Sequence, residues 1–210
     1  MIHFLIIGIV LGLSAGCSPG PLLTLVISET LRHDIASGIR VAVAPLVTDL
    51  PIILLTLFIS AQLVNFHAIL GFISLAGGFF VLRLGVAGIR SKGTELQIVQ
   101  EKKPASLTKG IVANALSPHP YLFWLSVGAP TMASAMKVDG MAPLAFIGGF
   151  YVFLVGSKMV LAILVGKSKM FLSGKVYRYT LRFLGLLLCG FAVVLLHEGL
   201  TFLGMAWKAT

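Results

Sequence analysis

Long stretches of uncharged, mostly apolar residues alternate with short polar links along most of the chain. Six such stretches stand out, and only Asp49 and Lys158 place a charge well inside one of them. Each stretch is long enough to cross a bilayer as a helix, which takes about 20 residues. The stretches are too long for the strands of a β-barrel and lack their alternation. The pattern therefore predicts transmembrane helices at residues 4–28, 41–63, 68–89, 110–136, 140–166 and 181–203.

The composition supports the same class of protein. Of the 210 residues, 58% are hydrophobic and 11% are charged, against about 25% charged residues in a soluble domain. The mean hydropathy is +1.02. A water-soluble fold of this length cannot bury so much apolar surface. We therefore exclude a soluble enzyme, a disordered chain and a disulfide scaffold, and expect an all-α polytopic membrane protein with one transmembrane domain over residues 1–210.

The basic residues predict the orientation of this domain. Thirteen of the 16 Lys and Arg residues lie in or beside the links that follow the first, third and fifth stretches. The positive-inside rule places these links in the cytoplasm and both termini on the opposite side of the membrane. The longest link, residues 91–108, is expected to be a cytoplasmic loop. No basic run is interleaved with aromatic residues, so the net charge of +9 predicts membrane orientation and no nucleic-acid partner.

Two similar motifs divide the chain into halves. The first stretch contains Ser18 followed by Pro19-Gly20-Pro21, and the fourth contains Ser117 followed by Pro118-His119-Pro120. Asp49 and Lys158 also correspond to one another, in the second and fifth stretches. Because three helices begin and end on opposite sides of a membrane, a second copy of such a unit is inverted. We predict two inverted three-helix repeats, at about residues 1–90 and 109–210, with helices 1 and 4 broken at the Pro-x-Pro motifs.

The broken helices indicate where a ligand binds. Each proline removes a backbone N–H donor and disturbs the preceding turn. The carbonyl groups that are released cannot face lipid, so they line an enclosed or watery cavity. Broken helices at matching places in inverted repeats are typical of transporter binding sites. The predicted substrate or coupling-ion site comprises Pro19, Gly20, Pro21, Asp49, Asn114, Pro118, His119, Pro120 and Lys158.

The polar members of this site have more than one interpretation. Asp49 is costly within a bilayer, and it is either a proton carrier, a ligand for a cationic group, or half of a structural ion pair with Lys158. His119 is either a group that titrates near neutral pH or a hydrogen-bonded packing residue. Asn114 is either part of the site or a hydrogen-bond partner of the broken backbone. The sequence leaves these alternatives open.

The motifs also carry a resemblance to a known family. Pro19-Gly20-Pro21 in the first stretch, Thr48-Asp49 in the second, and Asn114 followed by Pro118 in the fourth resemble the LysE/RhtB family of bacterial amino-acid exporters. The resemblance covers nearly the whole chain. It implies an inner-membrane carrier, driven by an ion gradient, that exports amino acids or similar small metabolites. Members usually carry a basic residue where this chain has His119, so either Lys158 supplies that charge or the substrate is a different one.

Two other functions remain as alternatives. A metal-ion exporter needs a cluster of Asp, His and Cys residues in the spans, for which Asp49, His119 and Cys17 are the candidates. A thiol–disulfide carrier needs two cysteines that meet, and the chain contains Cys17 and Cys189. We expect no enzymatic activity, cofactor or bound metal. The expected partners are a small-molecule substrate, protons and membrane lipid, and the sequence is compatible with a monomer or a homodimer.

Overall fold

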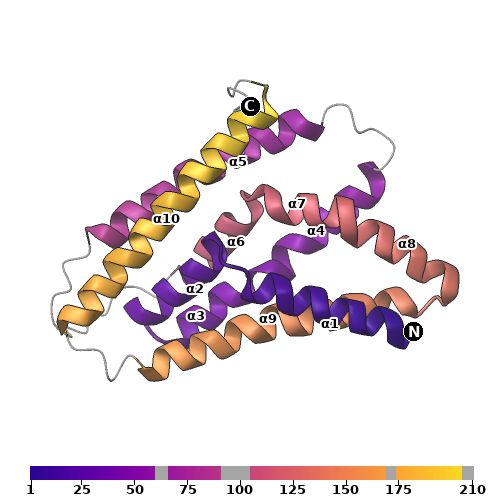
Figure 1. Cartoon of the computed structure of the whole chain (residues 1–210), viewed down its shortest axis with the longest axis horizontal. Helices are drawn as coiled ribbons and strands as arrows, with labels where there is room; N and C mark the ends of the chain where they lie inside the picture. Colours follow the sequence, from indigo (N-terminus) through magenta and orange to yellow (C-terminus); the bar gives the residue numbers. More distant parts are fainter. Residues whose placement is uncertain (60–65, 91–104, 169–173, 205–210) are drawn as a thin grey trace.

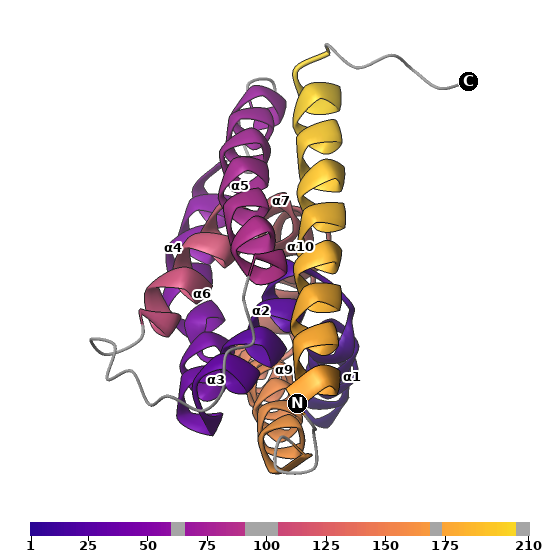
Figure 2. The ribbon, with the colours of Figure 1, turned by 90° about the vertical axis from the view of Figure 1, so that its left-hand side faces the viewer.

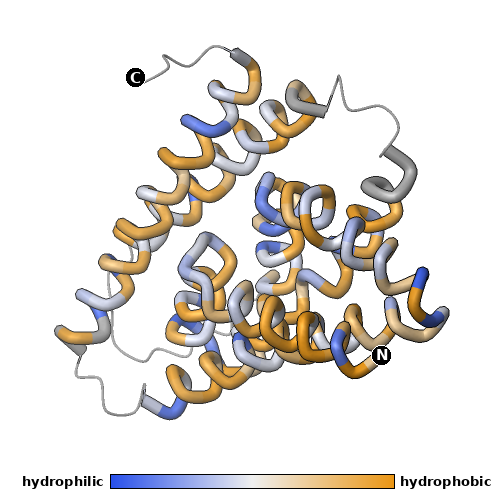
Figure 3. Tube along the Cα trace, turned by 45° about the vertical axis from the view of Figure 1, so that its right-hand side comes forward, coloured by the Kyte–Doolittle hydropathy of each residue, from blue (hydrophilic) through white to orange (hydrophobic). Residues whose placement is uncertain are grey.

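The computed structural model describes residues 1–59, 66–90, 105–168 and 174–204. Within these ranges the regular structure is entirely helical. Hydrophobic residues cover most of the length of the helices (Figure 3). Four helical segments are long and apolar enough to cross a membrane, and a bent pair of helices adds a fifth candidate. The protein is therefore a multi-pass helical membrane protein, and the count of six spans stays a prediction.

The first predicted span consists of two helices that meet at the first Pro-x-Pro motif. Helix α1 runs over Ile2–Cys17 and α2 over Pro21–Arg32, and their axes differ by 61°. Ser18 and Gly20 between them have extended backbone angles. Pro21 is at the start of α2, where its missing N–H has no helical partner to lose. The second helix ends beyond residue 28, where the prediction ended the first span.

The second predicted span begins earlier than residue 41. Helix α3 (Ile35–Ala42) precedes α4 (Ala44–Ile59), and the apolar segment that could cross the membrane is Ile35–Leu54. Asp34 starts α3, because its side chain accepts a hydrogen bond of 2.7 Å from the backbone N–H of Ser37. The same hydrogen bond lowers the pKa of Asp34. The predicted span began at residue 41 because Arg40 interrupts the uncharged stretch. In the structure the Arg40 side chain is exposed on α3.

The fourth predicted span is divided more finely than its proline motif suggested. It comprises α6 (Ser106–Ala115), α7 (Pro118–Phe123), a π-helical turn labelled η2 (Trp124–Gly128) and α8 (Ala129–Val138). The π-helical turn ends just before Pro130, which lacks the N–H that an α-helix would direct to the carbonyl of Ser126. A side chain at Gly128 would collide with the indole ring of Trp124. A single helix over residues 110–136 interrupted only at Pro118–Pro120 was therefore too simple.

The remaining helices form two closely packed pairs. Helix α9 (Ala142–Ser168) packs along α1, and α10 (Gly174–Phe202) packs along α5 (Phe66–Ile89) (Figures 1 and 2). The first pair depends on small residues in α1. A Cβ atom at Gly8 would meet the backbone carbonyl of Phe146, and one at Gly12 would meet that of Phe150. Close backbone approach of this kind is how glycine-rich ridges join helices in membranes.

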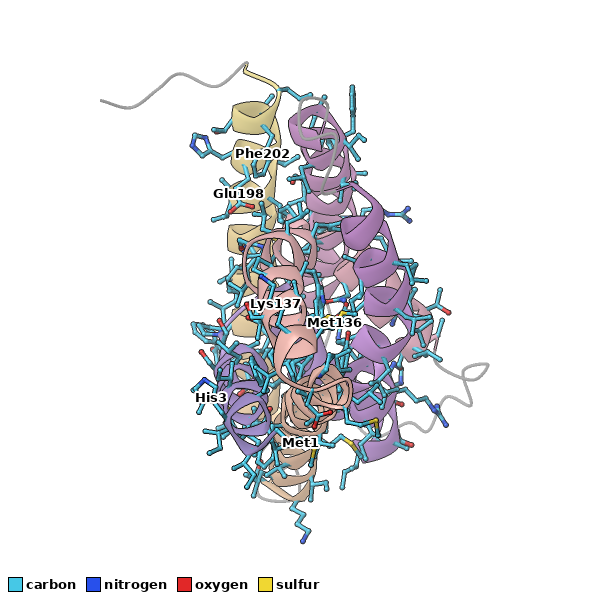
Figure 4. The ribbon with its side chains drawn as sticks, turned by 90° about the vertical axis from the view of Figure 1, so that its right-hand side faces the viewer. Met1, His3, Met136, Lys137, Glu198 and Phe202 are labelled. Atoms are coloured by element: carbon cyan, nitrogen blue, oxygen red, sulfur yellow. The ribbon has the colours of Figure 1, made fainter. Side chains whose placement is uncertain are left out.

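The shorter helices lie between the two long pairs. Five shorter helices occupy the space between the α1–α9 pair and the α5–α10 pair (Figure 1): α2, α3, α4, α6 and α7. Both helix breaks lie among these helices; Ser18 and Pro19 at the first break are exposed, whereas Ser117 and Pro118 at the second are buried. Seen from the right-hand side of Figure 1, Met1 and His3 lie low in the view, Met136 and Lys137 on α8 lie at mid-height, and Glu198 and Phe202 on α10 lie above them (Figure 4).

Candidate functional site

A cavity of about 360 Å³ lies at the two helix breaks. All but one of the predicted site residues line it, and they come from both halves of the chain. The exception is Pro118, which is buried at the start of α7 next to the cavity-lining Ser117. The predicted residues in the lining are Pro19, Gly20, Pro21, Asp49, Asn114, His119, Pro120 and Lys158.

Lys158, on α9, caps the broken end of α1. Its side chain is only 3% exposed, and its Nζ donates hydrogen bonds to the carbonyl oxygens of Ala15 at 3.1 Å and Gly16 at 3.0 Å. Pro19 lacks the N–H that would have bonded the Ala15 carbonyl in a continuous helix. The ammonium group thus replaces backbone donors and places a positive charge at a helix C-terminus, where it is stabilised.

Asp49, on α4, is held at the other break. Its side chain is 4% exposed, and its Oδ1 accepts hydrogen bonds from Asn114 Nδ2 at 2.9 Å and from Thr48 Oγ1 at 3.2 Å. Asn114 Nδ2 also donates to Thr48 Oγ1 at 2.7 Å. Asn114 is the last residue but one of α6, immediately before the second break. These hydrogen bonds connect the carboxylate to the broken helix of the opposite half.

The two buried charges face the same cavity but do not form an ion pair. In the part of the chain that the structure describes, no carboxylate lies within 4.0 Å of Lys158 Nζ. Lys158 instead bonds the break of α1, and Asp49 bonds the residue before the break of α6. The structure thus favours separate positions for the two charges over the structural ion pair that the sequence left open.

His119 lies at the exposed edge of the cavity. Its Nδ1 is 3.1 Å from Ser117 Oγ, within the second break. Its Nε2 is 3.9 Å from Glu198 Oε1 on α10. Glu198 lies near the end of the sixth predicted stretch, and the sequence pattern assigns it no role. The contact with α10 depends on tertiary packing that no local pattern indicates.

Two aromatic residues near Asp49 were also missed. Trp124 lines the cavity and is 1% exposed, and Tyr151 packs beside it from α9. Both polar groups, the indole Nε1 and the phenol hydroxyl, lie close to the Asp49 carboxylate. Among the described residues, the indole N–H and the phenol hydroxyl are both buried without a hydrogen-bond partner. Asp49 is therefore surrounded by donors from α4, α6, η2 and α9.

A further buried carboxylate joins the two halves away from the cavity. Glu29, on α2, accepts hydrogen bonds from Ser106 Oγ at 2.6 Å and from Lys109 Nζ at 2.8 Å, both at the start of α6. His33 Nε2 is 3.8 Å from the same carboxylate. Glu29 is the first residue after the uncharged stretch that predicted the first span, so it resembled the start of a polar link.

One comparison identifies the family. The family model for LysE type translocators matches residues 13–199, which include both breaks, Asp49 and Lys158. The chain belongs to the LysE type translocator family. No curated protein and no solved structure gives a significant match. The resemblance seen in the proline motifs is thus confirmed, and it assigns the protein to transport rather than to catalysis.

The cavity gives this LysE type translocator one buried acid and one buried base. The hydrogen bonds from Asn114 and Thr48 both end on Oδ1 of Asp49, and Lys158 makes two hydrogen bonds to backbone carbonyls. Cys17 and Cys189 are free thiols. The described residues contain no group of three or more His, Cys, Asp or Glu side chains placed to hold a metal ion.

Proposed function

We propose that this translocator is a secondary active exporter of amino acids or related small metabolites across the bacterial inner membrane, coupled to the proton gradient. The observation that carries the proposal is the pair of oppositely charged, buried side chains, Asp49 and Lys158, on one cavity between two broken helices. A zwitterion matches such a pair. Its ammonium group is complementary to Asp49, and its carboxylate is complementary to Lys158.

The reciprocal contacts support two inverted repeats of three spans. Asp49, in the second predicted span, accepts a hydrogen bond from Asn114 next to the break of the fourth span. Lys158, in the fifth predicted span, donates a hydrogen bond to the Ala15 carbonyl at the break of the first span. An inverted repeat relates these two contacts by one axis in the membrane plane, as in other transporters of this type. The excess of basic residues in the links that follow the first, third and fifth stretches supports a periplasmic position for both termini.

Proton coupling is assigned to Asp49. A carboxylate that is buried among donors can hold either a cationic group of the substrate or a proton, but not both at once. Substrate release to the periplasm followed by proton uptake at Asp49 would return a site in which the Asp49 carboxyl group is neutral and Lys158 carries the remaining charge. In the same cycle Lys158 returns to the carbonyls of Ala15 and Gly16, so no charge is left without a partner.

The experiment uses the purified protein in proteoliposomes with an imposed pH gradient and a panel of labelled amino acids. The wild type is expected to accumulate at least one of them against its gradient. Asp49→Asn keeps the side-chain shape and is expected to abolish accumulation driven by the pH gradient. Asp139→Asn, at the exposed junction of α8 and α9, is the matched control and should transport normally.

Two results would contradict the proposal. If no amino acid or related metabolite is transported by the wild type, the substrate class is wrong. If Asp49→Asn accumulates substrate as the wild type does, the gradient is not coupled through this carboxylate.

A further inference from the structure

Part of the cavity wall is apolar. Helix α10 contributes Phe191, Val194 and Leu195, and each of these side chains lacks a polar atom. Phe191 and Leu195 are four residues apart, so they lie on one face of the helix. Leu195 is buried in the cluster that joins α10 to α5, which fixes this face in position. Phe150 and Leu154 extend the apolar surface from α9.

The ionisable groups of the lining are already assigned. They are Asp49, Lys158 and His119, and His119 faces Glu198 at the exposed edge. Once the ammonium and carboxylate groups of an amino acid are matched by Asp49 and Lys158, this lining offers no further charge to its side chain. A charged side chain would then be buried without a partner, which is strongly unfavourable.

The size of the cavity restricts the ligand as well. Its volume of about 360 Å³ is near the lower end of ligand pockets, which measure about 300–1,000 Å³. Such a space suits a single small molecule rather than a peptide. An apolar side chain gains free energy by leaving water for a surface of this kind, roughly in proportion to the area that it buries.

We propose that the site selects amino acids with an uncharged, apolar side chain, and that Phe191, Val194 and Leu195 form the surface against which this side chain packs. The inference rests on the proposed function, because it assumes that an amino acid occupies the cavity. It extends the proposed function by naming the class of amino-acid side chain that is transported, and it assigns the selection of this side chain to α10.

The test measures competition in the same proteoliposomes. Labelled L-leucine is exchanged against unlabelled L-isoleucine, L-serine, L-lysine or L-glutamate. We expect L-isoleucine to compete at least about tenfold better than L-lysine or L-glutamate, since a missing or extra methylene alone is worth about 10–200-fold in an apolar pocket. L-serine should be intermediate.

Variants of α10 locate the selection. Val194→Asp adds a carboxylate to the cavity wall and should reduce the preference for L-leucine over L-lysine by about tenfold or more. Val193→Asp is the control, because Val193 is on the same helix and does not line the cavity. Val193 and Val194 are both partly exposed, at 63% and 49%, so the two variants add the same charge at positions of similar exposure. Leu195→Ala shortens the wall without adding a charge. It should weaken competition by L-leucine more than competition by L-serine.

The outcomes separate the two proposals. If the wild type exchanges L-lysine or L-glutamate as well as L-leucine, the inference is overturned and the proposed function stands. If Val194→Asp and Leu195→Ala both fold and leave the order of competitors unchanged, α10 does not select the side chain and the inference also fails. If the wild type exchanges no amino acid at all, the proposed function fails and this inference fails with it.

Discussion

The Glu29–Lys109 contact between α2 and α6 gives a prediction whose size can be worked out from the structure. The carboxylate side chain is 2% exposed, and the lysine side chain is 30% exposed. The two side chains therefore differ in burial. Without Glu29, the ammonium group of Lys109 can turn toward solvent, but without Lys109 the carboxylate stays buried.

The two single substitutions should consequently differ in cost. Lys109→Met leaves a buried negative charge that still contacts Ser106 and His33 but has lost its lysine partner. Breaking a fully buried ion pair costs about 3–5 kcal/mol of unfolding free energy, and this partly buried pair should cost up to that amount. Glu29→Gln removes the buried charge and weakens two hydrogen bonds to a charged group, which costs about 1.5–3 kcal/mol. The double variant contains no buried charge at this position, so it should be more stable than Lys109→Met alone.

The assay is denaturant unfolding of the purified protein in detergent micelles, followed by tryptophan fluorescence. Lys137→Met is the matched control, because Lys137 is exposed on the last turn of α8. Surface substitutions of this kind change stability by less than about 0.5 kcal/mol. The double-mutant cycle then isolates the interaction between the two side chains.

The reasoning would be refuted by either of two results. One is a Lys109→Met variant that unfolds like the Lys137→Met control. The other is a Glu29→Gln variant that is less stable than Lys109→Met, because that order would mean that the carboxylate is not the buried partner.

Two further predictions concern helix packing and orientation. Gly12→Ala places a Cβ atom against the carbonyl of Phe150 and should destabilise the fold by about 1–3 kcal/mol in thermal unfolding. Gly156→Ala is the control: its Cβ atom meets no atom within 4 Å, so this variant should be neutral or more stable by up to about 1 kcal/mol. Equal losses of stability for both variants would argue against the close α1–α9 contact. Alkaline phosphatase fused after Thr210 should be active and a fluorescent protein fused there should be dark, since the C-terminus is expected in the periplasm; the opposite pair of results would invert the orientation.

The helix breaks and the buried charges could be predicted because both are local properties of the chain. A proline lacks its N–H wherever it lies, so Pro19 and Pro118 mark interruptions without knowledge of the neighbouring helices. A charge in an apolar stretch is equally visible, and Asp49 and Lys158 stood out for that reason. Their placement on one cavity followed from the expected repeat.

The partners of these residues depend on packing between distant helices. The sequence does not indicate that Lys158 bonds the carbonyls of Ala15 and Gly16, because that contact depends on how α9 lies along α1. Glu29 was missed for a related reason: one charge beside an apolar stretch is typical of a polar link. Trp124 gave no signal either, because an indole in a membrane helix is common and only the fold shows that its N–H lies close to Asp49.

The position of Lys158 links occupancy of the cavity to the shape of the first span. The ammonium group now stabilises two carbonyl oxygens at a bend of 61°. Any ligand that draws this group away leaves those oxygens without their donors, and so raises the free energy of this particular bend relative to other angles between α1 and α2. Thermodynamic reciprocity then requires that the angle between the two helices set the affinity for that ligand by the same factor. A single side chain can in this way make ligand affinity differ between two conformations of one protein, so that ligand release is coupled to a change in the angle of the first span.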